Sequence, residues 1–150
     1  MKAWLELGTL AAMAGVAVGA ELAPPGGRPL SEVLKAAEDR GVSQITEATL
    51  DDGVWEIEAR RDQQPVELKL HPVTLAVIEE HPDSQSVAPP TEGLTAREIA
   101  LAVEKAGYGL VVEIDRARQY WEVEAYRQSG RRKLHVSPAD GRILSDRADD

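Results

Sequence analysis

The sequence repeats itself at an interval of 66 residues, and this repeat limits the possible folds more than any other feature. The shift places Trp55-Glu56-Ile57-Glu58-Ala59 on Trp121-Glu122-Val123-Glu124-Ala125. Without a gap, residues 30–83 and 96–149 share 13 identities in 54 positions. The interval is longer than that of most solenoid repeats, so the sequence predicts a duplicated unit rather than an array.

Each copy is expected to begin with a helix. Apolar residues recur at helical spacing, and those predicted to face the core are Leu30, Val33, Leu34 and Ala37 in the first copy and Ile99, Ala102, Val103 and Ala106 in the second. Gly41 and Gly107 supply helix ends that take positive φ. Thr95 and Glu98 have the spacing of a capping box at the start of the second helix.

Strand-like alternation follows each helix. The predicted strands lie at 44–50, around Trp55, at 66–71 and at 76–79, and in the second copy at 110–115, around Trp121, at 131–136 and at 142–145. Trp55 and Trp121 share the phase of the apolar positions and are predicted to be core residues. In the strand at 110–115, Leu110, Val112 and Ile114 are expected to point inward.

The predicted fold class is therefore α+β, with two tandem repeats, each one helix packed on a small antiparallel sheet of three or four strands. Turns at Asp51-Asp52-Gly53 and Gln128-Ser129-Gly130 are expected to close hairpins. A unit of about 55 residues buries only about 60% of its unfolded surface and is marginally stable alone. The two units are therefore expected to pack together, or the protein to form a homodimer.

The N-terminus is interpreted as an export signal. Lys2 precedes an apolar run of about a dozen residues, and Val18-Gly19-Ala20 offers small residues for cleavage near Ala20. The run is too short to span a bilayer, so no membrane span is expected after cleavage, and the mature protein is expected to be periplasmic or extracellular. A buried N-terminal helix and an uncleaved anchor remain the alternatives.

These signals divide the chain into six segments. They are a signal peptide at 1–20, a flexible leader at 21–29, a first repeat at 30–80, a linker at 81–93, a second repeat at 94–146 and a tail at 147–150. The linker is assigned because it is polar and contains three prolines.

Composition excludes several classes of protein. The chain has no cysteine, which excludes disulfide scaffolds and thiolate metal sites. Its net charge of −9 argues against nucleic-acid binding. The charge is uneven, because residues 21–83 hold 6 basic and 14 acidic residues and residues 84–150 hold 10 and 11.

No catalytic, cofactor or metal residues are predicted. The sequence lacks the nucleophile, phosphate-binding and zinc motifs of common enzymes. His71 and His81 each precede a proline and are expected to lie in solvated turns rather than on a metal. The carboxylate pairs Glu56/Glu58 and Glu122/Glu124 are expected on a solvated sheet face, opposite Lys69 and Lys133.

One surface is predicted to bind a protein partner. The outer sheet face of the second copy would display, beside Glu122 and Glu124, the candidate residues Tyr120, Tyr126, Arg131, Lys133 and His135. Tyr and Arg are enriched where proteins anchor on one another. The alternative is an ordinary wet face stabilised by cross-strand pairs.

The order of motifs resembles the PepSY domain of exported bacterial proteins and of thermolysin-type peptidase propeptides. The matching segments of the second copy are Gly107-Tyr108, Tyr120-Trp121-Glu122-Val123 and Pro138-Ala139-Asp140-Gly141-Arg142-Ile143-Leu144. The first copy departs from this pattern, because Val42 replaces the tyrosine and Val73-Thr74-Leu75-Ala76 replaces the Asp-Gly turn.

The resemblance implies a non-catalytic module without a cofactor. The expected function is to bind, and to restrain or inhibit, an extracytoplasmic protein such as a peptidase. The alternative is an envelope sensor or binder of a small ligand, an ion or a cell-wall polymer, held in the groove between the two repeats.

Overall fold

The computed structural model describes residues 25–84, 88, 90, 92–128 and 130–149. The predicted signal at 1–20, its cleavage position at Ala20 and the first part of the leader lie outside these residues.

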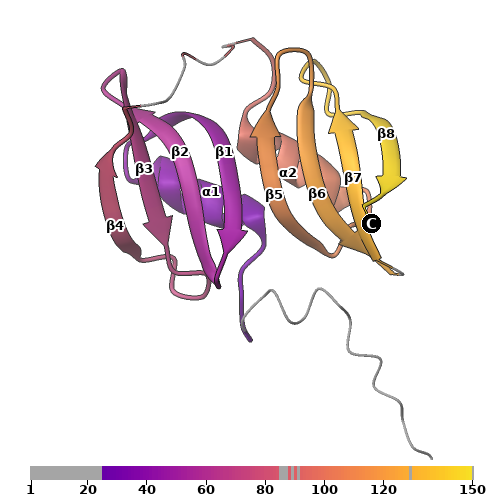
Figure 1. Ribbon diagram of the computed structural model, residues 1–150, viewed down its shortest axis with the longest axis horizontal. Coiled ribbons are helices and arrows are strands. Elements are labelled where there is room, and N and C mark those ends of the chain that lie inside the picture. Colours follow the sequence, from indigo (N-terminus) through magenta and orange to yellow (C-terminus); the bar gives the residue numbers. More distant parts are fainter. Residues whose placement is uncertain (1–24, 85–87, 89, 91, 129, 150) are drawn as a thin grey trace, which may run out of the picture.

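Within these residues, two helices and eight strands follow one another as one helix and four strands, twice (Figure 1). The first half contains α1 (Leu30–Asp39), β1 (Ser43–Asp51), β2 (Val54–Arg61), β3 (Gln64–Leu70) and β4 (Val77–Pro82). The second half contains α2 (Ala96–Lys105), β5 (Leu110–Arg116), β6 (Trp121–Arg127), β7 (Gly130–Val136) and β8 (Ile143–Ala148). The α+β class predicted from the sequence is confirmed.

All eight strands belong to one antiparallel sheet, in the order β4-β3-β2-β1-β5-β6-β7-β8. The expectation of two small separate sheets is wrong, because β1 pairs with β5. This pairing is short and joins Glu47 to Asp115, Ala48 to Ile114 and Thr49 to Glu113. It gives each half a neighbour for the strand edge that it would otherwise expose.

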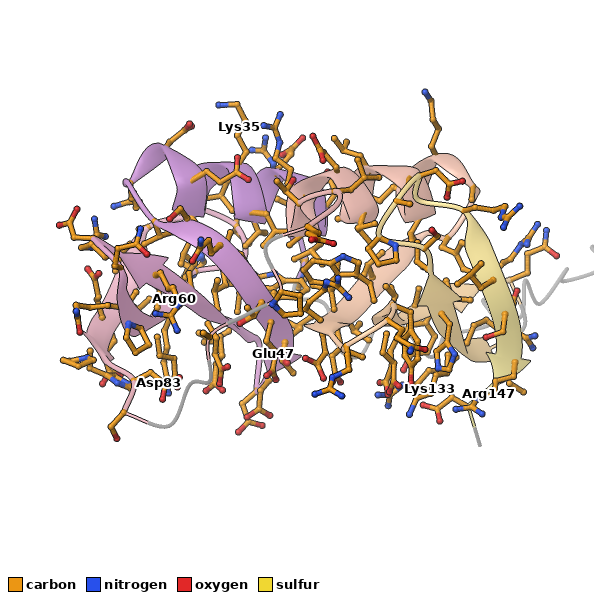
Figure 2. All side chains as sticks on the ribbon, turned by 90° about the horizontal axis from the view of Figure 1, so that it is seen from above. Lys35, Glu47, Arg60, Asp83, Lys133 and Arg147 are labelled. Atoms are coloured by element: carbon orange, nitrogen blue, oxygen red, sulfur yellow. The ribbon has the colours of Figure 1, made fainter. Side chains whose placement is uncertain are left out.

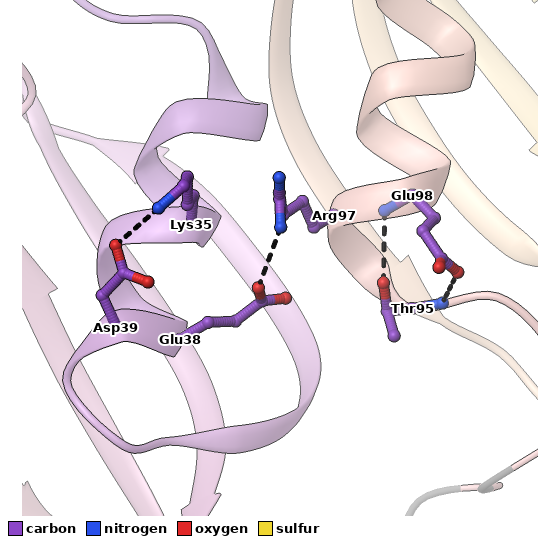
Figure 3. Close-up of polar contacts among 6 residues, drawn as sticks. All are labelled: Lys35, Glu38, Asp39, Thr95, Arg97 and Glu98. Carbon is purple, nitrogen blue, oxygen red and sulfur yellow. Dashed lines mark hydrogen bonds and ion pairs between the residues drawn. The ribbon is translucent and has the colours of Figure 1, made fainter.

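Both helices lie on the same face of the sheet, as the edge-on view shows (Figure 2). They run antiparallel, because Ser31 at the start of α1 contacts Glu104 near the end of α2, at 2.6 Å between the hydroxyl and carboxylate oxygens. At their other ends Arg97 reaches Glu38 at 3.5 Å (Figure 3). The opposite face, called the open face below, is covered by no helix among the described residues.

The 66-residue offset recurs in the contacts between the halves. Ala48 and Ile114, which face each other where β1 meets β5, are 66 residues apart. The contact of Ser31 with Glu104 becomes that of Arg97 with Glu38 when each residue is replaced by its equivalent in the other half. The two halves are therefore related by an approximate twofold axis through the Ala48–Ile114 pair.

The core lies between the helices and the sheet. The predicted inner face of α1 is fully buried, and Trp55 and Trp121 are 1% and 3% exposed, which confirms them as core residues. The capping box of Thr95 and Glu98 is present (Figure 3). Gly41 and Gly107 take positive φ after their helices, at 86° and 99°.

The prediction that Leu110 points inward is wrong. A β-bulge between Val111 and Glu113 adds one residue to β5, so Val111 faces the core opposite Ala125 and Leu110 lies opposite Tyr126 on the open face. Simple alternation cannot reveal such an insertion.

In α2 the inner face is shifted. Ala106 is exposed, and Ala96 and Ala100 are buried instead. The reason is that α2 ends at Lys105, so Ala106 is its C-cap. The buried residues of α2 are the equivalents, 66 residues on, of the buried apolar residues of α1.

The hairpin between β1 and β2 is closed by Asp52 and Gly53 as predicted, with φ of 48° and 75°. Gln128 begins the second predicted turn, of which Ser129 lies outside the described residues. Arg127 pairs with Gly130 across this turn.

The last strand of each half is longer than predicted. β4 continues to Pro82 and β8 to Ala148. His81 therefore lies in a strand rather than in a solvated turn. His71 does lie in an exposed turn, where its Nδ1 accepts hydrogen bonds from the backbone N–H groups of Val73 and Thr74, both at 3.1 Å.

Candidate functional site

The open face of the sheet carries the charged side chains that alternate with the core. Glu47 and Lys133 project from this face, away from the helices, whereas Lys35 lies on the helix side (Figure 2). The strand registers sort these side chains into rows that cross the sheet from β4 to β8, and two rows differ sharply in charge.

One row places five carboxylates side by side on five successive strands. From β3 to β6 it consists of Glu67, Glu58, Glu47, Asp115 and Glu122. We call these five residues the acidic row. His81 continues it on β4 and His135 on β7. Like charges directly opposite each other destabilise a sheet, so this arrangement costs folding free energy rather than supplying it.

The neighbouring row mixes both charges. It places Lys69 opposite Glu56 and Lys133 opposite Glu124, although Glu113 and Glu124 also lie opposite each other. Lys69 on β3 lies 3.1 Å from Glu56 on β2. On β7, Lys133 lies 3.4 Å from Glu124 and also 3.4 Å from Glu122. The predicted pairing with Lys69 and Lys133 is confirmed for Glu56, Glu122 and Glu124. It is wrong for Glu58, which lies opposite Glu67.

The central carboxylates of the acidic row lack cations. Among the described residues, Glu47, Glu58 and Asp115 have no ion-pair partner. Burial raises the pKa of Glu47 above its ordinary value, and the neighbouring carboxylates of Glu58 and Asp115 raise it further. Burial, followed by nearby carboxylates, also raises the pKa values of Glu58 and Asp115.

The five residues of the predicted partner surface come together at one end of the acidic row. Arg131 lies opposite Tyr126, and His135 lies opposite Glu122. The ring of Tyr120 stacks on the imidazole of His135, with 3.9 Å between ring centroids and 18° between planes. Tyr120 thus lies at the end of the acidic row, where His135 is 3.6 Å from the carboxylate of Glu122.

The cations of this surface are occupied by local carboxylates. Arg131 contacts the carboxylate of Glu124, and its Nε lies 3.1 Å from Asp149. Glu124 is only 8% exposed, because Arg131 and Lys133 flank it on β7. Arg131 and Lys133 are therefore already paired, whereas Glu47, Glu58 and Asp115 on the same face have no ion pair among the described residues.

A groove of about 270 Å³ lies between the two halves. It is found where β1 and β5 stop pairing, next to the first turn of α2. Its lining combines Val42, Ile45, Leu94, Ala96, Arg116 and Trp121 with other polar residues of both halves. Arg116 lies over the ring of Trp121, with 5.6 Å from the guanidinium carbon to the ring centroid.

Sequence reasoning missed the acidic row and the residues of the groove. The row depends on strand registers, which carry irregularities in both β1 and β5. Its one visible signal was the excess of acidic residues in the first half. The groove depends on the pairing of β1 with β5, which no local pattern encodes.

The described part of the chain shows neither a metal-binding cluster nor a membrane-spanning helix. There, no group of three or more His, Asp or Glu side chains is arranged to hold a metal ion. In the same residues, no helix is long and apolar enough to cross a membrane.

Comparison with protein families defines the class of this fold. Residues 3–81 match the family described as the peptidase propeptide and YPEB domain, which is the PepSY family. The match includes α1, β1, β2 and β3 entirely. The chain therefore belongs to the PepSY family.

Among solved structures, the chain is similar to a protein of Clostridium difficile 630 described as a "putative lipoprotein". The two share 15% identity with a TM-score of 0.46, over 83% of this chain and 95% of the other. No curated protein matches the sequence.

Proposed function

We propose that this PepSY protein is an exported, non-catalytic binding module whose open sheet face docks on an extracytoplasmic protein, such as a peptidase, and restrains it. Membership of a family named for peptidase propeptides supports the class of partner. The constant offset between equivalent contacts supports two PepSY-like units in tandem.

The acidic row is the observation that carries this proposal. Five carboxylates in register lower the stability of the isolated protein. A partner that brings Lys or Arg side chains to the row would relieve this repulsion on binding, and complementary charge favours both specificity and fast association.

The predicted partner surface supplies anchors at one end of the row. Tyr120 and Tyr126 are half-buried on the open face, and aromatic side chains of this kind contribute much of the binding energy at interfaces. Because Arg131 and Lys133 are already paired with Glu124, the surface is complementary to a basic partner rather than to an acidic one.

The test is a retention experiment with matched variants. The chain is immobilised, and extracytoplasmic proteins of the source organism are passed over the wild type and over Glu47→Gln/Asp115→Asn. We expect a basic protein to be retained by the wild type and lost from this variant. Tyr120→Ala/Tyr126→Ala should weaken retention while leaving the circular dichroism spectrum unchanged.

Glu32→Gln/Asp39→Asn is the matched control. It also removes two carboxylates, but both lie on α1, on the helix side of the sheet, in exposed pairs with Arg28 and Lys35. Equal retention by both charge variants would refute docking through the acidic row. If the retained protein is a peptidase, adding the chain should lower its activity, and unchanged activity would refute restraint.

A further inference from the structure

We propose that the groove between the two halves binds a small carboxylate that carries an apolar group. This site is distinct from the acidic row and rests on different residues. A volume of about 270 Å³ lies just below the range of about 300–1,000 Å³ typical of sites for drug-sized ligands. The groove therefore suits a small acid rather than a folded partner.

Arg116 supplies a cation that the protein does not neutralise. Its Nη1 donates hydrogen bonds to the backbone carbonyls of Ala117 and of Tyr120, the latter at 3.3 Å. These bonds fix the guanidinium, but within the described residues no carboxylate forms an ion pair with it. Burial lowers the pKa of Arg116, because desolvation disfavours the charged form of the guanidinium.

Trp121 supplies a hydrogen-bond donor without an acceptor. The residue lines the groove and is 3% exposed, and its indole Nε1 has no partner among the described residues. Buried N–H groups in proteins nearly always have an acceptor. The indole ring lies beneath the Arg116 guanidinium, so an anion bound at Arg116 would change the surroundings of this N–H.

The first turn of α2 adds a third favourable element. Thr95 and Ala96 line the groove. The capping box uses the backbone N–H groups of Thr95 and Glu98 (Figure 3), and the N–H of Ala96 has no partner among the described residues. The positive end of the helix dipole at this point favours an anion.

Two acidic residues line the groove, Glu38 and Glu92. They do not cancel the positive charge of Arg116 and of the start of α2. Glu38 is already paired with Arg97 at 3.5 Å (Figure 3), and Glu92 is exposed, where water screens its charge. The apolar residues Val42, Ile45 and Leu94 remain to contact an apolar group of the ligand.

The approximate twofold axis provides an internal comparison. The position equivalent to Arg116 in the first half is Leu50, whose side chain packs partly against the core. A leucine is thus accommodated at this position in the same local fold. Arg116→Leu is therefore a variant that should fold while losing the cation.

The probe is N-acetyl-L-leucine, and the comparison ligand is N-acetyl-L-leucinamide, which has the same apolar group without the charge. Each is titrated into the full chain while the indole N–H signal of Trp121 is followed by NMR. We expect a saturable shift with the acid and binding at least about tenfold weaker with the amide. Equal binding of the two, or no saturable shift, would overturn the proposal.

Variants then test the residue assignment. Arg116→Leu should weaken binding of the acid about tenfold or more, and Arg116→Lys, which keeps the charge, should weaken it less. Arg118→Leu is the control, because Arg118 is an exposed arginine that does not line the groove. If Arg116→Leu and Arg118→Leu bind alike, the assignment is wrong.

Two sources could supply this carboxylate, namely a free acid or the C-terminus of a peptide. Acetyl-Gly-Gly-Leu with a free C-terminus separates them. If the peptide binds as tightly as N-acetyl-L-leucine, the proposal is supported and peptide C-termini are ligands of the groove. If N-acetyl-L-leucine binds and the peptide does not, the proposal is supported with free acids as the ligands.

Discussion

Gly93, just before α2, has no room for a side chain. A Cβ at this position would lie 2.4 Å from the carbonyl oxygen of Pro138, and the backbone has a φ of 92°. The same carbonyl accepts a hydrogen bond from the Leu94 N–H at 2.7 Å. We expect Gly93→Ala to lower the free energy of unfolding by about 2 kcal/mol or more, because it adds a clash to left-handed strain. Urea denaturation measures this loss.

Gly107→Ala is the control for backbone strain alone. Gly107 has a similar φ of 99°, but a Cβ there would meet no atom within 4 Å. We expect a loss of about 1 kcal/mol. Equal losses for the two variants would show that contact with Pro138 is not the cause.

His71 and Ser137 occupy equivalent turns and perform the same task. The Nδ1 of His71 accepts from the N–H of Val73, and the hydroxyl of Ser137 accepts from the N–H of Ala139 at 3.2 Å. We expect His71→Ser to change stability by less than about 0.5 kcal/mol and His71→Ala to cost about 1 kcal/mol. Melting temperatures that fall equally in both variants would contradict this role.

At the scale of elements, the acidic row predicts an unusual pH dependence. Raised carboxylate pKa values mean that the folded chain binds protons more readily than the unfolded chain. The destabilising contribution is complete at neutral pH and is relieved as the pH falls through the folded-state values. We therefore expect the melting temperature to rise between pH 7 and about pH 5. A steady fall over this range would contradict the prediction.

One substitution isolates this effect. Glu47→Gln removes the central charge of the acidic row, and we expect it to raise the free energy of unfolding by about 0.5–1 kcal/mol at pH 7. The rise in melting temperature toward pH 5 should shrink in this variant. Glu56→Gln serves as the control, because Glu56 faces Lys69 at 3.1 Å and its removal should not stabilise the protein.

The elements themselves were largely predictable because their signals are local. Gly41 and the pair Thr95 and Glu98 mark helix ends through neighbouring backbone groups. The bulge between Val111 and Glu113 was not predictable. Consecutive apolar residues precede Glu113, so the sequence does not show which of them point inward. The acidic row depends on that irregularity and on the one in β1, so its register could not be read from spacing.

At the scale of the whole molecule, the shared sheet predicts that both halves unfold together. The two halves are joined in the sheet by the pairing of Ala48 with Ile114. They are joined in the helix layer by the contact of Ser31 with Glu104. We expect one urea transition, with the same midpoint whether Trp55 or Trp121 reports it in chains that keep only that tryptophan. Separate midpoints would show that the halves unfold independently.

The pairing of β1 with β5 into one sheet could not be predicted from the sequence, and the reason is physical. Two separate sheets and one continuous sheet satisfy the same hydrophobic pattern, and only the contact of one edge strand with another distinguishes them. The predicted partner residues Tyr120 and His135 were placed together correctly on one face, because cross-strand neighbours follow from alternation and hairpin register. Whether they bind a partner stays a prediction.

The approximate twofold axis through Ala48 and Ile114 arranges the two halves like the subunits of a dimer, but here one chain connects them. Connecting the halves covalently makes their association independent of protein concentration. A true homodimer of one half would carry each surface twice, and any mutation would appear on both sides of the axis. Here Arg116 lies on one side, and Leu50 occupies the equivalent position on the other. A single chain can therefore change one of two equivalent positions without changing its counterpart.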